Sequence, residues 1–209
     1  MEEFSTMRKL NQMTPSVVRV GDGRGFVVNG DRGSKLILTA GHCLPFVPPC
    51  MNFSDLGERT YRELIGRIEQ EPTISAECMF IDSISDIAVL GAPDDQELGE
   101  ECDAYEAFME SLVGFSAADV MRTDLKDFRG GQPDGAIGYV LSLGGEWQQC
   151  RMWHIGGPLW LAGASIDGGM SGSPILSANG EAVGVIASNG GQPRLAHNLP
   201  GWVLKLLAL

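Results

Sequence analysis

The chain has 209 residues, 44% of them hydrophobic and 20% charged, which allows a substantial core and excludes a disordered or fibrous protein. Its formal net charge of -12 repels phosphate backbones and anionic lipids, so neither nucleic acid nor a membrane surface is an expected partner. No apolar run reaches the length of about 18 residues that a membrane span needs.

Short apolar runs rich in Val, Ile and Leu recur along the chain between clusters of Gly, Pro, Asn and Asp, a pattern typical of an all-β barrel or sandwich. The predicted strands are, in chain order, Ser16–Val20, Gly25–Val28, Lys35–Thr39, Ile87–Leu90, Ala136–Leu143, Pro174–Leu176 and Ala182–Ala187. Asn29-Gly30-Asp31 predicts a turn between two of them. Asn179-Gly180 predicts a tight hairpin between the last two.

Two segments have helical patterns instead. Glu97–Val113 carries apolar residues at helical spacing and few β-branched residues, which predicts a helix-containing connector between two halves of the chain. Trp202–Leu209 predicts a short terminal helix with Pro200 near its start. Residues 1–12 are expected to be a flexible lead-in.

The connector is strongly acidic, and the simplest interpretation is a solvated face, with a docking site for a basic partner as the alternative. Eight acids gather in it or just before it: Asp94, Asp95, Glu97, Glu100, Glu101, Asp103, Glu106 and Glu110.

The five cysteines are odd in number and lack paired spacing such as CxxC, which suits a reducing compartment better than a disulfide framework and gives no support for zinc. The sequence MEEFSTMRKL at the N-terminus has two early acids and no apolar h-region, unlike a secretory signal. A complete chain of this kind is expected in the cytoplasm.

Three segments carry residues suited to chemistry. LTAGHC presents His42 at the end of a strand, SDIAVL places Asp86 just before a buried strand, and DGGMSGSP holds Ser171 in a glycine-rich bend. Each alone has an ordinary structural explanation. Together they supply what acyl transfer needs: a hydroxyl nucleophile, a general base, and a buried acid that fixes the tautomer of the base.

The bend around Ser171 also suits an oxyanion hole. Gly168 and Gly169 can adopt positive φ angles, which would let the backbone N–H groups of Gly169 and Ser171 point at one spot.

The blocks TAGHC, SDIAVL and GGMSGSP resemble the signature blocks of the chymotrypsin-like, or trypsin-like, serine peptidase family, in the chain order that the family uses. The separations of 44 residues from His42 to Asp86 and 85 residues from Asp86 to Ser171 are also similar. The resemblance implies two six-stranded antiparallel β-barrels with a cleft between them, and a serine endopeptidase that cleaves proteins or peptides without a metal or organic cofactor.

That resemblance divides the chain into a first barrel at 13–95 with His42 and Asp86, a connector at 96–130, a second barrel at 131–196 with Ser171, and a C-terminal tail and helix at 197–209. Met170 stands where secreted relatives carry the Asp that pairs with a newly freed N-terminus, so that zymogen switch is not expected. The GxSGSP form of the block is similar to the bacterial branch of the family.

The family alignment also implies a substrate pocket. Ser165 would lie at its base, and Ala187, Ser188 and Asn189 would form the wall that pairs with the substrate backbone. An uncharged base predicts an uncharged or small polar side chain before the cut bond, although Asp167 lies close by in sequence.

Other functions fit the sequence less well. An α/β-hydrolase needs G-x-S-x-G with its acid and base after the serine, and here only Glu181 and His197 follow Ser171. GDGRG at residues 21–25 lacks the Walker lysine of a phosphate loop. Two alternatives stay open: a catalytically silent double barrel that binds a peptide or partner, and a protease that a regulatory protein partner activates.

Overall fold

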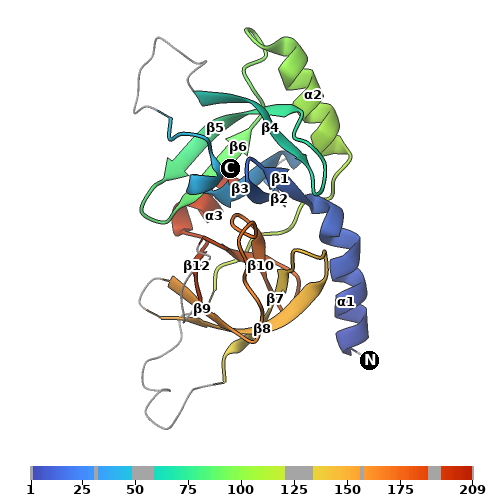
Figure 1. Cartoon of the computed structure of the whole chain (residues 1–209), viewed down its shortest axis with the longest axis vertical. Coiled ribbons are helices and arrows are strands. Elements are labelled where there is room, and N and C mark those ends of the chain that lie inside the picture. The colour runs from blue at the N-terminus through green and yellow to red at the C-terminus, as the bar shows by residue number, and fades with distance from the viewer. Residues whose placement is uncertain are drawn as a thin grey trace.

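The computed structural model of the chain describes residues 2–30, 33–48, 59–120, 134–155, 158–187 and 194–208. Two closed antiparallel barrels of six strands lie one above the other (Figure 1), which confirms the predicted fold class. The first barrel is built from β1 (Val17–Val20), β2 (Gly23–Asn29), β3 (Lys35–Ala40), β4 (Thr60–Arg67), β5 (Ile74–Asp82) and β6 (Ile87–Gly91). The second is built from β7 (Ala136–Leu141), β8 (Trp147–His154), β9 (Pro158–Ala162), β10 (Pro174–Ser177), β11 (Ala182–Val185) and β12 (Arg194–Asn198).

Both barrels have the same topology. The first runs β1-β2-β3-β6-β5-β4 and closes through the pairing of β1 with β4, and the second runs β7-β8-β9-β12-β11-β10 and closes through β7 and β10. The predicted Asn179-Gly180 hairpin joins β10 to β11, and Gly180 has the positive φ of 80° that such a turn requires. The Asn29-Gly30-Asp31 turn lies partly outside the described residues.

The barrel cores are apolar and meet at the junction. The largest apolar cluster fills the first barrel around Phe26, Ile37 and Leu90 and continues into the second through Leu141 and Leu176. A smaller cluster fills the rest of the second barrel, with Val140, Met152, Leu159 and Ile175 among its members. Burial of these side chains supplies the main driving force that holds the two barrels together.

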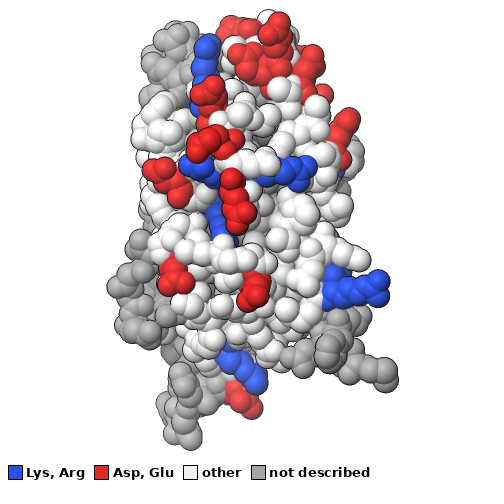
Figure 2. Space-filling model, turned by 45° about the vertical axis from the view of Figure 1, so that its right-hand side comes forward, with Lys and Arg blue, Asp and Glu red and all other residues white. Residues whose placement is uncertain are grey.

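The connector begins with helix α2 (Gly99–Glu110), as its sequence pattern predicts. After the helix the backbone runs between the barrels, because Phe115 pairs with Val28 of the first and Ala117 with Ala182 of the second. The exposed acids of α2 gather at one end of the molecule (Figure 2). The last ten residues of the expected connector range lie outside the described residues.

The two ends of the chain form helices that cross over between barrels (Figure 1). Residues 1–12 were expected to be a flexible lead-in, but Glu2–Met13 forms helix α1, because Met7, Leu10 and Met13 recur on one face and pack on the core. Lys9 of this helix donates to the carbonyl of Asn179 in the second barrel.

Helix α3 (Gly201–Leu207) is the terminal helix that the sequence predicts. It follows the second barrel in the chain and packs on the first. The Trp202 ring lies 6.0 Å from that of Phe80, and its indole N–H donates to Asp82 at 3.4 Å. Over the described part of the chain, every helix is too short or too polar to cross a membrane.

Candidate active site

His42 and Asp86 meet at the edge of the first barrel. His42 lies in η3 (Gly41–Cys43), one turn of 3-10 helix that follows β3. Asp86 immediately precedes β6, the strand that pairs with β3. Ring Nδ1 of His42 is 2.6 Å from Asp86 Oδ2, and the backbone N–H of His42 donates to Oδ1 at 2.9 Å. Because an ionised carboxylate only accepts hydrogen bonds, this contact places the ring proton on Nδ1 and leaves Nε2 free to accept one.

Asp86 is held in an unusual backbone conformation. Its φ is +49°, a left-handed value that few non-glycine residues adopt and that surrounding contacts must maintain. Its carbonyl accepts the N–H of Gly41 at 3.0 Å. The sequence predicts a buried acid, whereas the Asp86 side chain is 26% exposed and that of His42 is 48% exposed.

Asp82 organises the turn that leads to Asp86. One oxygen of its carboxylate accepts the N–H groups of Ile84 and Ser85 at 2.9 and 3.0 Å, and the other accepts the indole N–H of Trp202. The bond from the Ser85 N–H contributes most to holding the pKa of Asp82 below its usual range. The turn that carries Asp86 is therefore fixed by its own backbone N–H groups and by helix α3.

Ser171 is the second residue of the second of two consecutive β-turns. The N–H of Met170 donates to the carbonyl of Asp167, and that of Ser173 donates to the carbonyl of Met170. The third residue of each turn is a glycine at positive φ: Gly169 at 90° and Gly172 at 83°, as a type II turn requires. The expectation of positive φ is thus met at Gly169 and is wrong for Gly168.

These turns leave three donors unused. The N–H groups of Met170, Gly172 and Ser173 are all bonded to backbone carbonyls, whereas those of Gly168, Gly169 and Ser171 donate to none of the described residues. The two N–H groups predicted for an oxyanion hole are therefore among the three that are available to a ligand in this bend.

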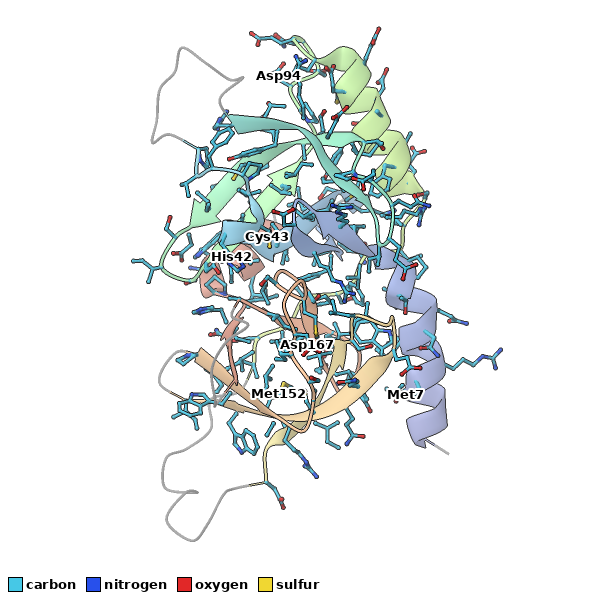
Figure 3. All side chains as sticks on the ribbon, viewed as in Figure 1. Met7, His42, Cys43, Asp94, Met152 and Asp167 are labelled. Atoms are coloured by element: carbon cyan, nitrogen blue, oxygen red, sulfur yellow. The ribbon has the colours of Figure 1, made fainter. Side chains whose placement is uncertain are left out.

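The carbonyl of Ser171 is fixed against the first barrel. It accepts the N–H of Arg24 at 2.7 Å and lies 3.6 Å from the thiol of Cys43, the residue that follows His42. Figure 3 shows His42 and Cys43 where the first barrel faces the second, and Asp167 in the second barrel. Burial raises the pKa of the Cys43 thiol, so it stays protonated and acts in packing.

Ser171 is buried at this junction, with 8% of the residue exposed. Within the described residues, no hydrogen bond joins its hydroxyl to the His42 ring. Such bonds are commonly long in free enzymes and shorten when substrate binds.

A family profile described as the trypsin-like peptidase domain matches residues 23–185, a range that includes His42, Asp86 and Ser171. The chain belongs to the trypsin-like peptidase family. It is thus a serine protease, a hydrolase of peptide bonds, and the resemblance seen in its sequence blocks is confirmed. A search of curated proteins finds no match.

Solved structures share the fold of this trypsin-like peptidase. The inactive form of the Rv3671c protease from M. tuberculosis is 17% identical, with a TM-score of 0.52 over 93% of this chain and 88% of that one. A serine protease of a human pathogenic astrovirus is 15% identical, with a TM-score of 0.53 over 90% and 92%. A serine endoprotease from Yersinia pestis is also 15% identical, with a TM-score of 0.58 over 97% and 64%.

The residues expected to form the substrate pocket of the peptidase are only partly described. Ser165 is exposed, and its hydroxyl lies 3.2 and 3.3 Å from the two carboxylate oxygens of Asp167. Ala187 follows β11 and is half-buried. Ser188 and Asn189 lie outside the described residues.

Sequence reasoning missed two residues that shape this site. Asp82 is not recognisable from the sequence as a residue that supports the site, because its partner Trp202 is 120 residues away. Arg24 was passed over as part of a glycine-rich turn, although an arginine between two glycines at a strand start is an unusual signal.

Among the described residues, no group of three or more potential ligand side chains is arranged to hold a metal ion.

Proposed function

We propose that the chain is a serine endopeptidase that acts through Ser171, His42 and Asp86 and forms an acyl-enzyme. The observation that carries this proposal is the pair of hydrogen bonds between Asp86 and His42. The next residue in the chain, Cys43, contacts the carbonyl of Ser171 through its thiol. Together these contacts support a base with its lone pair on Nε2, held beside the segment that bears the hydroxyl.

In the first half of the reaction, Ser171 Oγ attacks the carbonyl carbon of the substrate while its proton passes to His42 Nε2. The negative oxygen that forms accepts hydrogen bonds from the N–H groups of Gly169 and Ser171. Asp86 stabilises the imidazolium through Nδ1–H. The intermediate then collapses, the C–N bond breaks, and Nε2 returns the proton to the leaving amine.

In the second half, a water molecule attacks the ester carbon of the acyl-enzyme and gives its proton to His42 Nε2. Collapse of the second intermediate releases the carboxyl product and returns the proton to Ser171 Oγ. Each step uses only side chains and backbone groups of this chain together with water.

Activation by a freed N-terminus is not part of this proposal. Met170, directly before the nucleophile, is fully buried in the apolar cluster of the second barrel, and its Sδ lies 3.3 Å from the backbone N of Asp167. A thioether in an apolar environment offers no counter-charge to an ammonium group.

The substrate pocket is proposed to end at Ser165, with Ala187, Ser188 and Asn189 along its wall. The hydroxyl at the base suits an uncharged or small polar side chain. The carboxylate of Asp167 beside it disfavours an acidic side chain, because two like charges would face each other.

A cytoplasmic location in a bacterium is also part of the proposal. The described cysteines, Cys43, Cys78, Cys102 and Cys150, are free and buried, which supports a reducing compartment.

Labelling with a fluorophosphonate probe tests this function. We expect the folded wild-type chain to be labelled covalently at Ser171, and Ser171→Ala to remain unlabelled with the same thermal unfolding midpoint. Absence of labelling in the folded wild type would favour the silent binding module. Labelling that appears only after addition of a cell extract would favour activation by a partner.

A further inference from the structure

Arg24 is a buried cation that spans the junction between the barrels. It lies on β2 and is 5% exposed. Its guanidinium donates to three successive carbonyls at the end of β7, those of Leu141, Ser142 and Leu143, at 3.1, 3.0 and 3.3 Å. None of the salt bridges among the described residues involves Arg24. Burial lowers its pKa, in keeping with the cost of removing a charge from water.

The backbone of the same residue holds the nucleophile turn. The N–H of Arg24 donates to the Ser171 carbonyl at 2.7 Å. The carbonyl of Arg24 accepts the Thr39 hydroxyl at 2.6 Å and is so close to Gly172 that a Cβ there would lie 1.7 Å from it. Arg24 and the turn that follows Ser171 are therefore in direct backbone contact.

The side chain of Arg24 reaches the other donor of the proposed oxyanion hole through Leu143. A Cβ placed on Gly169 would lie 3.6 Å from Leu143 Cδ2, so the Leu143 side chain borders the turn that contains Gly169. Leu143 itself is 44% exposed, and the guanidinium of Arg24 holds its carbonyl.

We propose that Arg24 is a positioning residue for catalysis, which fixes the N–H groups of Ser171 and Gly169 relative to each other through its two sets of hydrogen bonds. This inference rests on the proposed function. Stability alone gives a weak reason for the arginine, because replacing a buried charge with an apolar side chain of similar volume is often neutral or stabilising. A positioning role predicts instead that such a replacement reduces catalysis while the fold persists.

The test compares Arg24→Met and Arg24→Lys with a matched control, Arg19→Met. Arg19 pairs with Arg24 in the register of β1 and β2 and also donates to backbone carbonyls, those of Gly21 and Gln70, but it stays within the first barrel. Saturation kinetics with the fluorophosphonate probe give the maximal inactivation rate kinact and the probe affinity KI separately for each variant.

We expect Arg24→Met to lower kinact by about 10²-fold, the effect of losing one oxyanion donor, with KI within about threefold of the wild type. Arg24→Lys should recover part of the loss, since an ammonium can bond some of the same carbonyls, and Arg19→Met should behave as the wild type. Equal kinact in Arg24→Met and Arg19→Met would overturn the proposal.

Amide hydrogen exchange over residues 168–173 provides a readout that needs no activity. Exchange should be faster in Arg24→Met and unchanged in Arg19→Met, and equal rates in the two would overturn the proposal. A wild-type chain that resists the probe would count against the proposed function, while exchange would still decide the role of Arg24. Should Arg24→Met fail to fold, the same comparisons with Arg24→Lys decide.

Discussion

Both oxygens of the Asp86 carboxylate bind His42, one through the ring at 2.6 Å and the other through the backbone N–H at 2.9 Å. The same carboxylate thus sets the orientation of the imidazole and the position of the chain that carries it. A substitution of Asp86 that preserves the shape of its side chain can change the state of the imidazole without disturbing the position of the backbone at His42.

Asp86→Asn is expected to keep the fold and lose most turnover. An amide nitrogen facing Nδ1 donates rather than accepts, so the ring proton moves to Nε2, which then cannot take the serine proton. Probe labelling should slow by about 10⁴-fold, with Ser171→Ala giving the background. Labelling at the wild-type rate would mean that another acid orients the ring, and Asp82 would be the first to examine.

Gly172→Ala tests how tightly the nucleophile turn packs on Arg24. Gly172 has a φ of 83°, and an added Cβ would overlap the carbonyl of Arg24 at 1.7 Å, so the backbone itself must move. Urea unfolding should show a loss of about 3 kcal/mol or more. The control is Gly145→Ala, where φ is 80° but nothing lies within 4 Å of the added carbon. There the loss should be about 1 kcal/mol.

Asp82 is expected to make stability depend on pH in the acid range. Its pKa is lower in the folded chain than the ordinary value of 3.8, chiefly through the Ser85 N–H, so its stabilising contribution is full above about pH 4. It is lost as the pH falls through the folded pKa, because the unfolded chain takes up the proton first. Asp82→Asn should therefore cost about 1 kcal/mol at pH 6 and less at pH 3. The control, Asp103→Asn on the exposed face of α2, should show little change at either pH.

Asp167 is expected to discriminate against acidic substrates. Profiling the cleavage products of a denatured proteome should show few cuts after Asp or Glu. In Asp167→Asn those cuts should increase by about tenfold, since one facing charge is removed. Glu146→Gln removes the same charge from the β7–β8 turn beside α1 and should leave the profile unchanged. An identical profile in Asp167→Asn would place the pocket elsewhere.

Two buried hydroxyls should respond in opposite directions. Ser173 Oγ is fully buried without a partner among the described residues, so Ser173→Ala should be neutral or stabilise the fold by about 1 kcal/mol. The Thr39 hydroxyl donates to Arg24 at 2.6 Å, and Thr39→Val should lower the unfolding free energy by about 1 kcal/mol. Thermal unfolding of both variants side by side measures the difference, and a destabilised Ser173→Ala would show that its hydroxyl has a partner in solution.

The sequence predicted the strands that are buried on both faces, and missed those that depend on tertiary context. β6 and the Gly25–Val28 part of β2 are continuous apolar runs, which are visible without an alignment. β4 contains charged residues and Glu63 at positive φ, with a shift of register between Tyr61 and Ile65. Such a bulge breaks the period of two on which strand prediction relies. β8 mixes polar and aromatic residues, so it also lacks the pattern on which strand prediction relies. β5, β9 and β12 are likewise not predicted from the sequence.

The candidate site shows the same division. His42, Asp86 and Ser171 lie in short blocks whose local chemistry is readable in the sequence. Arg24 acquires its role from carbonyls more than 110 residues away, and no local pattern predicts such partners.

The crossed helices at the two chain ends have a consequence for how the molecule folds. α1 precedes the first barrel but packs on the second, and α3 follows the second barrel but packs on the first. Either half, cut out at the connector, would lack the helix that covers it. The barrels are thus interdependent folding units, and the whole chain should unfold in one cooperative transition rather than one barrel at a time.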